Sequence, residues 1–226
     1  MARLRAETRE DHVATEAIPF SSAILTGGLP RASYAAQLAA YLPIHDALEM
    51  AIASAPHAAI RSVWGPDMHR VQLLRSDLDA LGASTTDLPP ATRARAEAFA
   101  EWIRQRAHAS PIALLGVLYV LEGSTLGGAL LSRRLAASFR LEDDGLRYYT
   151  PYGRHPKPHW TAFSARMNAA VTDQAEMAQV IDAARETFVR IGEILVTLSD
   201  PATSQDVARS AATVAVAQRE GHPRAG

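Results

Sequence analysis

Apolar residues recur at steps of three and four along most of the chain, and the alternation of apolar and polar residues that marks strands is nearly absent. Between residues 31 and 55, Tyr34, Leu38, Tyr41 and Leu48 fall on one stripe. Such a stripe predicts an amphipathic helix. Alanine, leucine and arginine, which favour helices, dominate the composition. The pattern therefore predicts an all-α protein.

The same pattern predicts further helices at about residues 3–16, 68–81, 91–108, 111–139, 160–171 and 173–198. Residues 19–22, 84–90 and 148–159 are expected to be loops. Pro43 is expected to kink or split the helix at 31–55, and Gly82 to end its helix in a left-handed conformation. No period of 20 to 50 residues indicates repeats. We expect one domain over residues 1–200, with 201–226 as a tail or an extra helix.

Charge and composition exclude several classes of function. Lys and Arg number 23 against 24 Asp and Glu, so nothing favours nucleic acid as a partner. The absence of cysteine excludes disulfides, thiolate metal sites and cysteine nucleophiles. The first ten residues are charged, unlike a signal peptide, and the longest apolar run, 112–121, is half of the ~20 residues that span a bilayer. We expect a soluble, cytoplasmic protein with no membrane partner.

Glycine interrupts the most apolar predicted helix, in the segment Leu118-Tyr-Val-Leu-Glu-Gly-Ser-Thr-Leu-Gly-Gly128. Each glycine costs a helix roughly 1 kcal/mol relative to alanine. Gly123 and Gly127 are four apart and share a face, where bare backbone can approach a flat ligand. Glycine also allows a helix to bend. The segment indicates a bound planar molecule, and close packing of two helices is the alternative.

The first predicted helix carries Leu4, Thr8, His12 and Glu16 at steps of four, which places them on one face. Arg5 precedes His12 by seven residues, or roughly 10 Å along a helix. An imidazole and a guanidinium at this separation suit a metal-centred macrocycle with a carboxylate at its rim. A glutamate one turn beyond the histidine can accept its other N–H. A surface histidine with a helical ion pair is the alternative.

Other histidines give weaker patterns. Prolines stiffen the segment between His155 and His159, which argues against a metal site there. His45 lies near Asp46 and Glu49, but a di-iron bundle needs repeated Glu and Glu-x-x-His sets. That repetition is missing from the sequence.

Taken together, the histidine segment 5–16 and the glycine segment 118–128 resemble the proximal and distal helices of the heme oxygenase family. The sequence is most similar to the bacterial branch, including the enzymes that accompany bacteriophytochromes. Segments 34–48, 73–81 and 163–168 add to the resemblance, which covers about residues 3–198. It implies a single-domain helical bundle with heme between the first helix and a kinked, glycine-rich helix.

The resemblance implies a role for each matching residue. His12 matches the proximal ligand of the heme iron, and Gly123 and Gly127 match the distal glycines over the heme face. Arg5 and Tyr119 match residues that contact the heme propionates. We expect Glu16 to fix the tautomer of the proximal histidine.

This sequence departs from the mammalian type of the family at two places. Ser124 stands where that type has an aspartate, which implies proton delivery through waters held by backbone carbonyls and Ser124. Trp160 and Ser164 stand where that type has a lysine and an arginine for the propionates. The second propionate then needs another base, and the candidates are Arg133, Arg154 and Lys157. A changed set of propionate contacts would rotate the heme and alter which meso carbon is cut.

The resemblance implies cleavage of heme, both substrate and cofactor, by O2 to biliverdin, iron and carbon monoxide. Catalysis is expected at His12, Gly123, Ser124 and Gly127. Electrons must come from an external donor such as ferredoxin, a reductase or ascorbate, because no Gly-x-Gly-x-x-Gly segment is present. A bacteriophytochrome is a candidate recipient of biliverdin. The alternatives are a non-enzymatic heme or tetrapyrrole binder and a thiaminase-like hydrolase, whose usual cysteine nucleophile is absent.

Overall fold

The computed structural model describes residues 1–142 and 144–199, so the tail or helix expected at 201–226 lies outside the described residues. Within those ranges the chain forms helices and loops and no strand, which confirms the all-α prediction. The helices are α1 (Ala2–Glu7), α2 (Arg9–Glu16), α3 (Pro19–Thr26), α4 (Arg31–Ser54), α5 (Ala58–Val63), η1 (Pro66–Met68), α6 (Val71–Leu81), η2 (Thr85–Asp87), α7 (Pro90–Ala109), η3 (Pro111–Ala113), α8 (Leu114–Phe139), α9 (Pro156–Ala170) and α10 (Gln174–Ser199).

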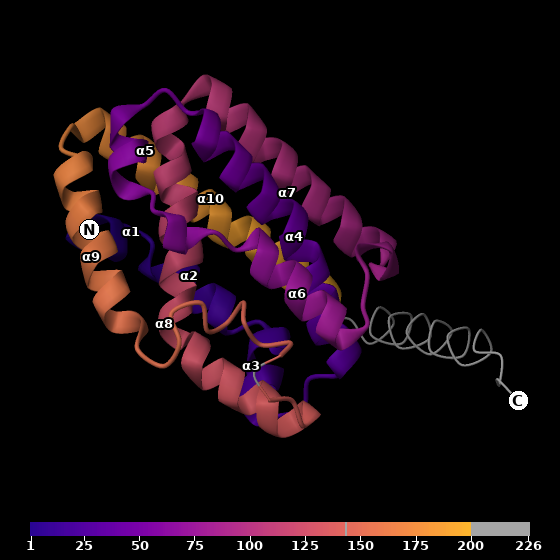
Figure 1. Ribbon diagram of the computed structural model, residues 1–226. Helices are drawn as coiled ribbons and strands as arrows, with labels where there is room; N and C mark the ends of the chain where they lie inside the picture. The colour runs from indigo at the N-terminus through magenta and orange to yellow at the C-terminus, as the bar shows by residue number, and fades with distance from the viewer. Residues whose placement is uncertain (143, 200–226) are drawn as a thin grey trace, which may run out of the picture.

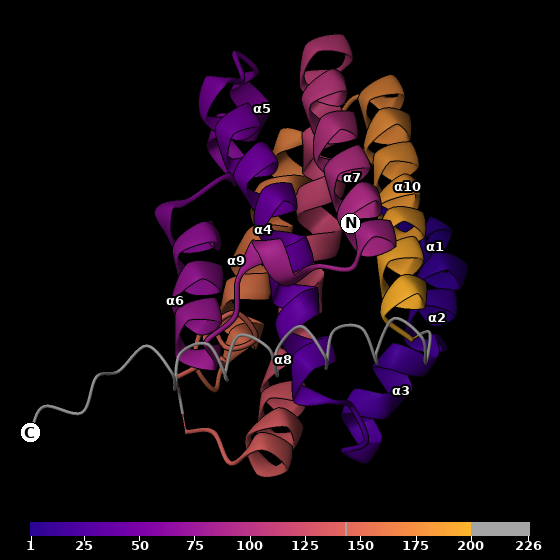
Figure 2. The ribbon, with the colours of Figure 1, turned by 90° about the vertical axis from the view of Figure 1, so that its right-hand side faces the viewer.

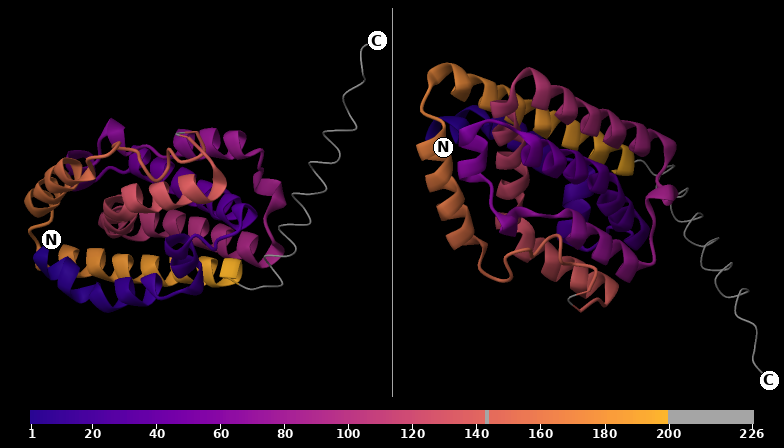
Figure 3. Two further views of the ribbon diagram at one scale, coloured as in Figure 1. Left: turned by 90° about the horizontal axis from the view of Figure 1, so that it is seen from below. Right: turned by 45° about the horizontal axis from the view of Figure 1, so that its top comes forward.

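Helix α8 occupies the centre of the bundle (Figure 1). Helix α10 packs along α8 and also packs against α7. Helices α7 and α10 run side by side in Figure 2. Helix α4 packs against α6 and α7, and α9 covers α5 and α8. Helices α1 and α2 also pack on α10. Viewed from below, α8 lies between the layer of α10 and the loop at 144–155 (Figure 3).

Two glycines allow neighbouring backbone to approach α8 closely. A Cβ atom on Gly116 would lie 2.1 Å from the carbonyl oxygen of Val180 in α10. A Cβ atom on Gly128 would lie 2.0 Å from the carbonyl oxygen of Tyr149 in the loop. Both distances are far inside van der Waals contact, so only glycine fits without a backbone shift. Gly128 therefore serves loop packing, whereas the side of α8 that carries Gly127 is open.

The path of α8 changes direction about midway along its length (Figure 1), as expected of a helix that contains several glycines. By length and composition alone, Pro111–Phe139 is apolar enough to cross a membrane, with a mean hydropathy of 1.6 over its best window. However, 61 % of that window is buried inside the protein. A helix that packs in the core of a bundle is apolar on most sides because those sides contact other helices.

Some local expectations were wrong. The helix expected at 3–16 is divided at Thr8, whose φ of −103° and ψ of 4° leave the helical region and whose hydroxyl donates to the Leu4 carbonyl at 2.9 Å. The loop expected at 19–22 is helix α3, with Pro19 in its first turn and Gly27 in a left-handed cap. Of the two outcomes expected at Pro43, the split does not occur: helix α4 continues through Pro43, and burial of both halves offsets the cost of about 3 kcal/mol.

Buried hydrogen bonds hold the loop at 144–155 against the bundle. The Asp77 carboxylate of α6 accepts from the backbone N–H groups of Arg147 and Tyr148, at 3.0 and 2.7 Å. The Tyr34 hydroxyl of α4 donates to the Gly145 carbonyl at 2.7 Å. The sequence predicts an irregular segment here, and these contacts give it one defined path, on the side of α8 that faces away from α10.

His45 is a buried titratable residue at the junction of α4 and this loop. Its Nε2 lies 3.2 Å from the Tyr148 hydroxyl. Burial, and to a smaller extent the nearby positive charge of Arg70, together lower the pKa of His45 to about 3. The imidazole is therefore neutral in the folded protein at neutral pH.

The two adjacent glycines of α8 are expected to respond oppositely to alanine. Gly128→Ala should lower the free energy of unfolding by about 1–3 kcal/mol because the loop must move. Gly127→Ala meets no atom within 4 Å and should raise it by up to about 1 kcal/mol through helix propensity. Denaturant unfolding of the heme-free protein checks both. Equal destabilisation by the two changes would contradict the packing described.

Acid should destabilise the protein through His45. Its pKa is near 6.5 when unfolded and about 3 when folded, so the unfolded chain binds the extra proton between these values and stability falls as pH falls. We expect a slope from this residue of up to about 1.4 kcal/mol per pH unit. His45→Gln should flatten the decline between pH 6.5 and 4 in denaturant titrations. Parallel curves for the two proteins would exclude this assignment.

Candidate functional site

One face of helix α8 is left uncovered by the residues that the structure describes. Leu126 and Leu130 on this face are 41 % and 51 % exposed. Gly127 lies between them, and a Cβ atom there would have no neighbour within 4 Å. Exposure of large apolar side chains costs roughly 25 cal/mol per Å², so a core helix with a bare apolar face is typical of a binding surface.

Helix α2 also has exposed side chains. It lies behind α8 in the view of Figure 1, and the view from below shows the two helices in different layers (Figure 3). The His12 side chain is 56 % exposed, and Val13 beside it is also exposed. The His12 ring contacts Phe188 of α10 edge-on, with ring centroids 5.7 Å apart. The Arg185–Asp11 ion pair, at 3.2 Å, further ties α2 to α10.

The two ring nitrogens of His12 differ in their surroundings. Nδ1 lies 3.4 Å from the Glu16 carboxylate. Nε2 has no hydrogen-bond partner among the residues that the structure describes. A carboxylate near one nitrogen favours a proton there and leaves the other free as a metal ligand. The single face expected for the histidine segment is only partly present, because Leu4 and Thr8 are buried, whereas His12 and Glu16 are exposed.

At the other end of the bare face, α9 contributes an aromatic wall. The Trp160 ring lies 3.5 Å from the position that a Cβ on Gly123 would take. Tyr119 is buried, and its ring lies 5.7 Å from that of Trp160. The structure thus brings Tyr119, Gly123 and Trp160 together, although Trp160 entered the sequence analysis only as a departure.

Ser124 is exposed beside the glycine face, and its hydroxyl donates to the Leu121 carbonyl at 2.6 Å. This bond orients the hydroxyl oxygen, which can still accept hydrogen bonds from water. Arg5 is also exposed. Within residues 1–142 and 144–199, no acidic side chain pairs with Arg5 or with the other candidate bases, Arg133, Arg154 and Lys157.

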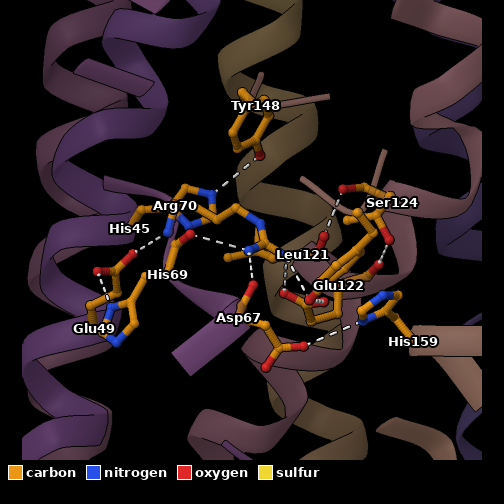
Figure 4. A network of polar contacts seen from close by, with 12 residues as sticks. His45, Glu49, Asp67, His69, Arg70, Leu121, Glu122, Ser124, Tyr148 and His159 are labelled. Atoms are coloured by element: carbon orange, nitrogen blue, oxygen red, sulfur yellow. Dashed lines mark hydrogen bonds and ion pairs between the residues drawn. The ribbon is translucent and has the colours of Figure 1, made fainter. Parts of the chain in front are cut away.

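A buried polar network connects α8 with the start of α6 and with Tyr152 of the loop (Figure 4). It was not predicted from the sequence. The Glu122 carboxylate pairs with Arg70 and accepts a hydrogen bond from Tyr152. Burial raises the pKa of Glu122, and Arg70 and Tyr152 oppose that rise. A lone carboxylate directly after the apolar run 112–121 was the available signal, because a charge in a core helix needs a partner.

The weaker histidine patterns do not form metal sites. His159 stacks on Tyr152 with centroids 4.0 Å apart, and its Nδ1 lies 3.4 Å from Asp67. His155 is exposed. No cluster of three or more His, Asp or Glu side chains that would suit a metal ion occurs in the described part of the chain.

A surface concavity of about 410 Å³ lies elsewhere, between α7, η3 and α10. Trp102, Arg106, Asp182 and Glu186 are among its lining residues. None of the residues assigned to heme lines it. The exposed apolar face of α8 is more pertinent, because Gly127, which the family resemblance assigns to the heme site, lies on it beside Leu126 and Leu130.

Comparisons with known proteins identify the family of this chain. A sequence model of the family described as heme oxygenase matches residues 1–197. Heme oxygenase 1 of the cyanobacterium Synechocystis is 24 % identical over 190 residues, which cover 83 % of this chain and 79 % of the relative. These findings identify a family on sequence grounds, independently of the fold.

Solved structures give the same result for the fold. Heme oxygenase-1 of Synechocystis in complex with heme superposes with a TM-score of 0.80 at 20 % identity, covering 96 % of this chain and 97 % of the other. Heme oxygenase of Leptospira interrogans gives 0.77 at 20 % identity, with 85 % and 96 % covered. The family match over nearly the whole described chain, on a bundle of this architecture, means that the protein belongs to the heme oxygenase family.

Proposed function

We propose that the protein binds heme between α2 and α8 and degrades it with O2 to biliverdin, iron and carbon monoxide. The observation that carries the proposal is the pairing of a bare, glycine-containing apolar face on α8 with a free imidazole nitrogen on α2. Membership of the heme oxygenase family supports the enzymatic function over simple heme binding.

The described residues fit a heme group on each side. Nε2 of His12 is the proposed iron ligand, and Glu16 holds the proton of the ring on Nδ1. Leu126, Gly127 and Leu130 form the opposite, apolar surface, on which the glycine lets a macrocycle approach the backbone. Apolar contact over a porphyrin face and one iron–imidazole bond together suit this ligand better than a small polar one.

The propionates require cations or hydroxyls at the rim. Arg5, which lies exposed on α1 and has no acidic partner among the described residues, is the proposed partner of one propionate, and the Tyr119 hydroxyl is an additional contact. Trp160 offers no charge on the α9 side, so the second propionate is assigned to one of the exposed bases Arg133, Arg154 and Lys157. We propose that this asymmetry sets the rotation of heme in the site.

Heme supplies the iron centre for oxygen activation and is itself the molecule that is cut. The chain orients it and controls water. Gly127 leaves open space on the distal side, and Gly123 lets the Trp160 ring pack against the helix backbone. The exposed hydroxyl of Ser124, oriented by the Leu121 carbonyl, provides an acceptor for water that delivers protons.

Electrons come from an external donor, for which we propose a ferredoxin or a reductase, with ascorbate as a substitute in vitro. We further propose a bacterial, cytoplasmic setting in which biliverdin passes to a bacteriophytochrome. The family resemblance to enzymes that accompany these photoreceptors supports that setting.

Substitutions at the two faces test heme binding. His12→Ala should leave the heme-free protein as stable as the original because this side chain is exposed, but should abolish the absorption spectrum of histidine-ligated heme. Added imidazole should restore it. Gly127→Leu should also fold, because a Cβ at this exposed position has no neighbouring atom within 4 Å, and should weaken hemin affinity by at least about tenfold through blocked approach. A normal hemin spectrum in His12→Ala without imidazole would refute the proximal assignment.

Turnover separates the enzyme from a heme carrier. With hemin and ascorbate or a reductase in air, the Soret band should decay while a bilin band grows and carbon monoxide is released. Bovine serum albumin loaded with hemin is the control for uncatalysed loss. A heme spectrum that persists through repeated reduction in air would favour the non-enzymatic binder.

A further inference from the structure

The ion pair behind the glycine segment is almost completely buried. Arg70 Nη2 lies 2.7 Å from Glu122 Oε1, and the two side chains are 3 % and 6 % exposed. A buried ion pair adds little net stability, because removal of both charges from water offsets their attraction. Such a pair fixes geometry when every donor and acceptor is used. Glu122 directly precedes Gly123, so geometry fixed here acts on the distal glycine.

Further hydrogen bonds hold both charges of this pair. The Tyr152 hydroxyl lies 2.7 Å from Glu122 Oε2, to which it donates, and accepts from Arg70 Nη2 at 2.9 Å. Arg70 Nη1 donates to the carbonyls of Asp67 and His69 at 2.8 and 3.2 Å. Because the guanidinium is planar and rigid, it can make all of these bonds in only one orientation. The bonds therefore fix the position of the Glu122 carboxylate relative to Arg70.

The network is anchored in the rest of the bundle. Glu49 of α4 accepts hydrogen bonds at Oε1 from the backbone N–H groups of Arg70 and Val71, at 2.6 and 3.0 Å. It contacts the His69 ring through Oε2 at 2.8 Å. The start of α6 is thereby fixed to α4, and Arg70 transmits that position to α8 (Figure 4).

The same network reaches α9. The rings of Tyr152 and His159 stack at 4.0 Å with an angle of 14° between their planes, and His159 Nδ1 lies 3.4 Å from the Asp67 carboxylate. The next residue is Trp160, whose ring rests against Gly123. Glu122 and His159 thus each precede one of the two residues that form the distal wall.

We propose that Arg70 and Tyr152 are positioning residues that fix Gly123 through Glu122 and Trp160 through His159. The consequence for catalysis rests on the proposed function: with the wall fixed, heme has one orientation and one meso carbon is cut. Arg70 and Tyr152 act through their neighbours and need no contact with heme.

Removal of the Tyr152 hydroxyl tests the proposal. Tyr152→Phe keeps the ring that stacks on His159 but loses the bonds to Glu122 and Arg70. Tyr149→Phe is the matched control, because its hydroxyl, in the same loop, donates to Gln37 at 2.8 Å instead. In the heme-free proteins, hydrogen exchange of residues 121–128 should be at least about tenfold faster in Tyr152→Phe than in the control, the effect of losing a hydrogen bond to a charged group.

Two further measurements complete the test. Arg70→Lys keeps the charge but loses the planar fork, and it should give the same local increase in exchange. With hemin and reductant, Tyr152→Phe should yield a mixture of biliverdin isomers, whereas Tyr149→Phe should keep the isomer ratio of the unmodified protein.

The outcomes distinguish the positioning role from the proposed function. Equal exchange at 121–128 in the Tyr152 and Tyr149 variants would overturn the positioning role, whether or not heme binds. Faster local exchange with an unchanged isomer ratio would overturn its effect on heme orientation. Faster local exchange with no hemin binding, even by the unmodified protein, would uphold the positioning role and refute the proposed function.

Discussion

Backbone contact on two sides of α8 is the constraint on which the rest of the structure depends. Gly116 admits α10 and Gly128 admits the loop at 144–155, so the helix is held without side chains at the points of closest approach. The face that carries Gly127 is left bare by the described residues. Helix α2, held to α10 by Asp11 and Arg185, presents His12 with a free nitrogen, and this pairing defines the proposed heme site.

The buried polar groups around α8 form two sets with different consequences. Asp77 and Tyr34 fix the path of the loop through its backbone. Arg70 and Glu122 instead bond to each other, and their charges are shielded from water. The first set resembles ordinary loop capping. The second lies directly beneath the distal glycine, where a small displacement would alter the space available to a ligand.

Sequence patterns predicted what depends on local chemistry. The apolar stripes gave most helices, and Gly82 ends α6 in the expected left-handed conformation. The family resemblance added the heme site, for which spacing alone left the alternatives open. Contacts between distant segments were not predictable: the role of Gly128 depends on Tyr149, and the partner of Glu122 is 52 positions away. The break at Thr8 depends on burial of Leu4 and Thr8, which no periodicity reveals.

A crystal structure of the hemin complex is the most direct test of the central claim. The expected result is iron bound to Nε2 of His12, with the porphyrin between α2 and the face of α8 that carries Gly127. The Tyr149 carbonyl should remain against Gly128, because that contact belongs to the frame and not to the ligand. Iron bound to another histidine, such as His155 or His159, or a porphyrin away from the bare face of α8, would contradict the claim.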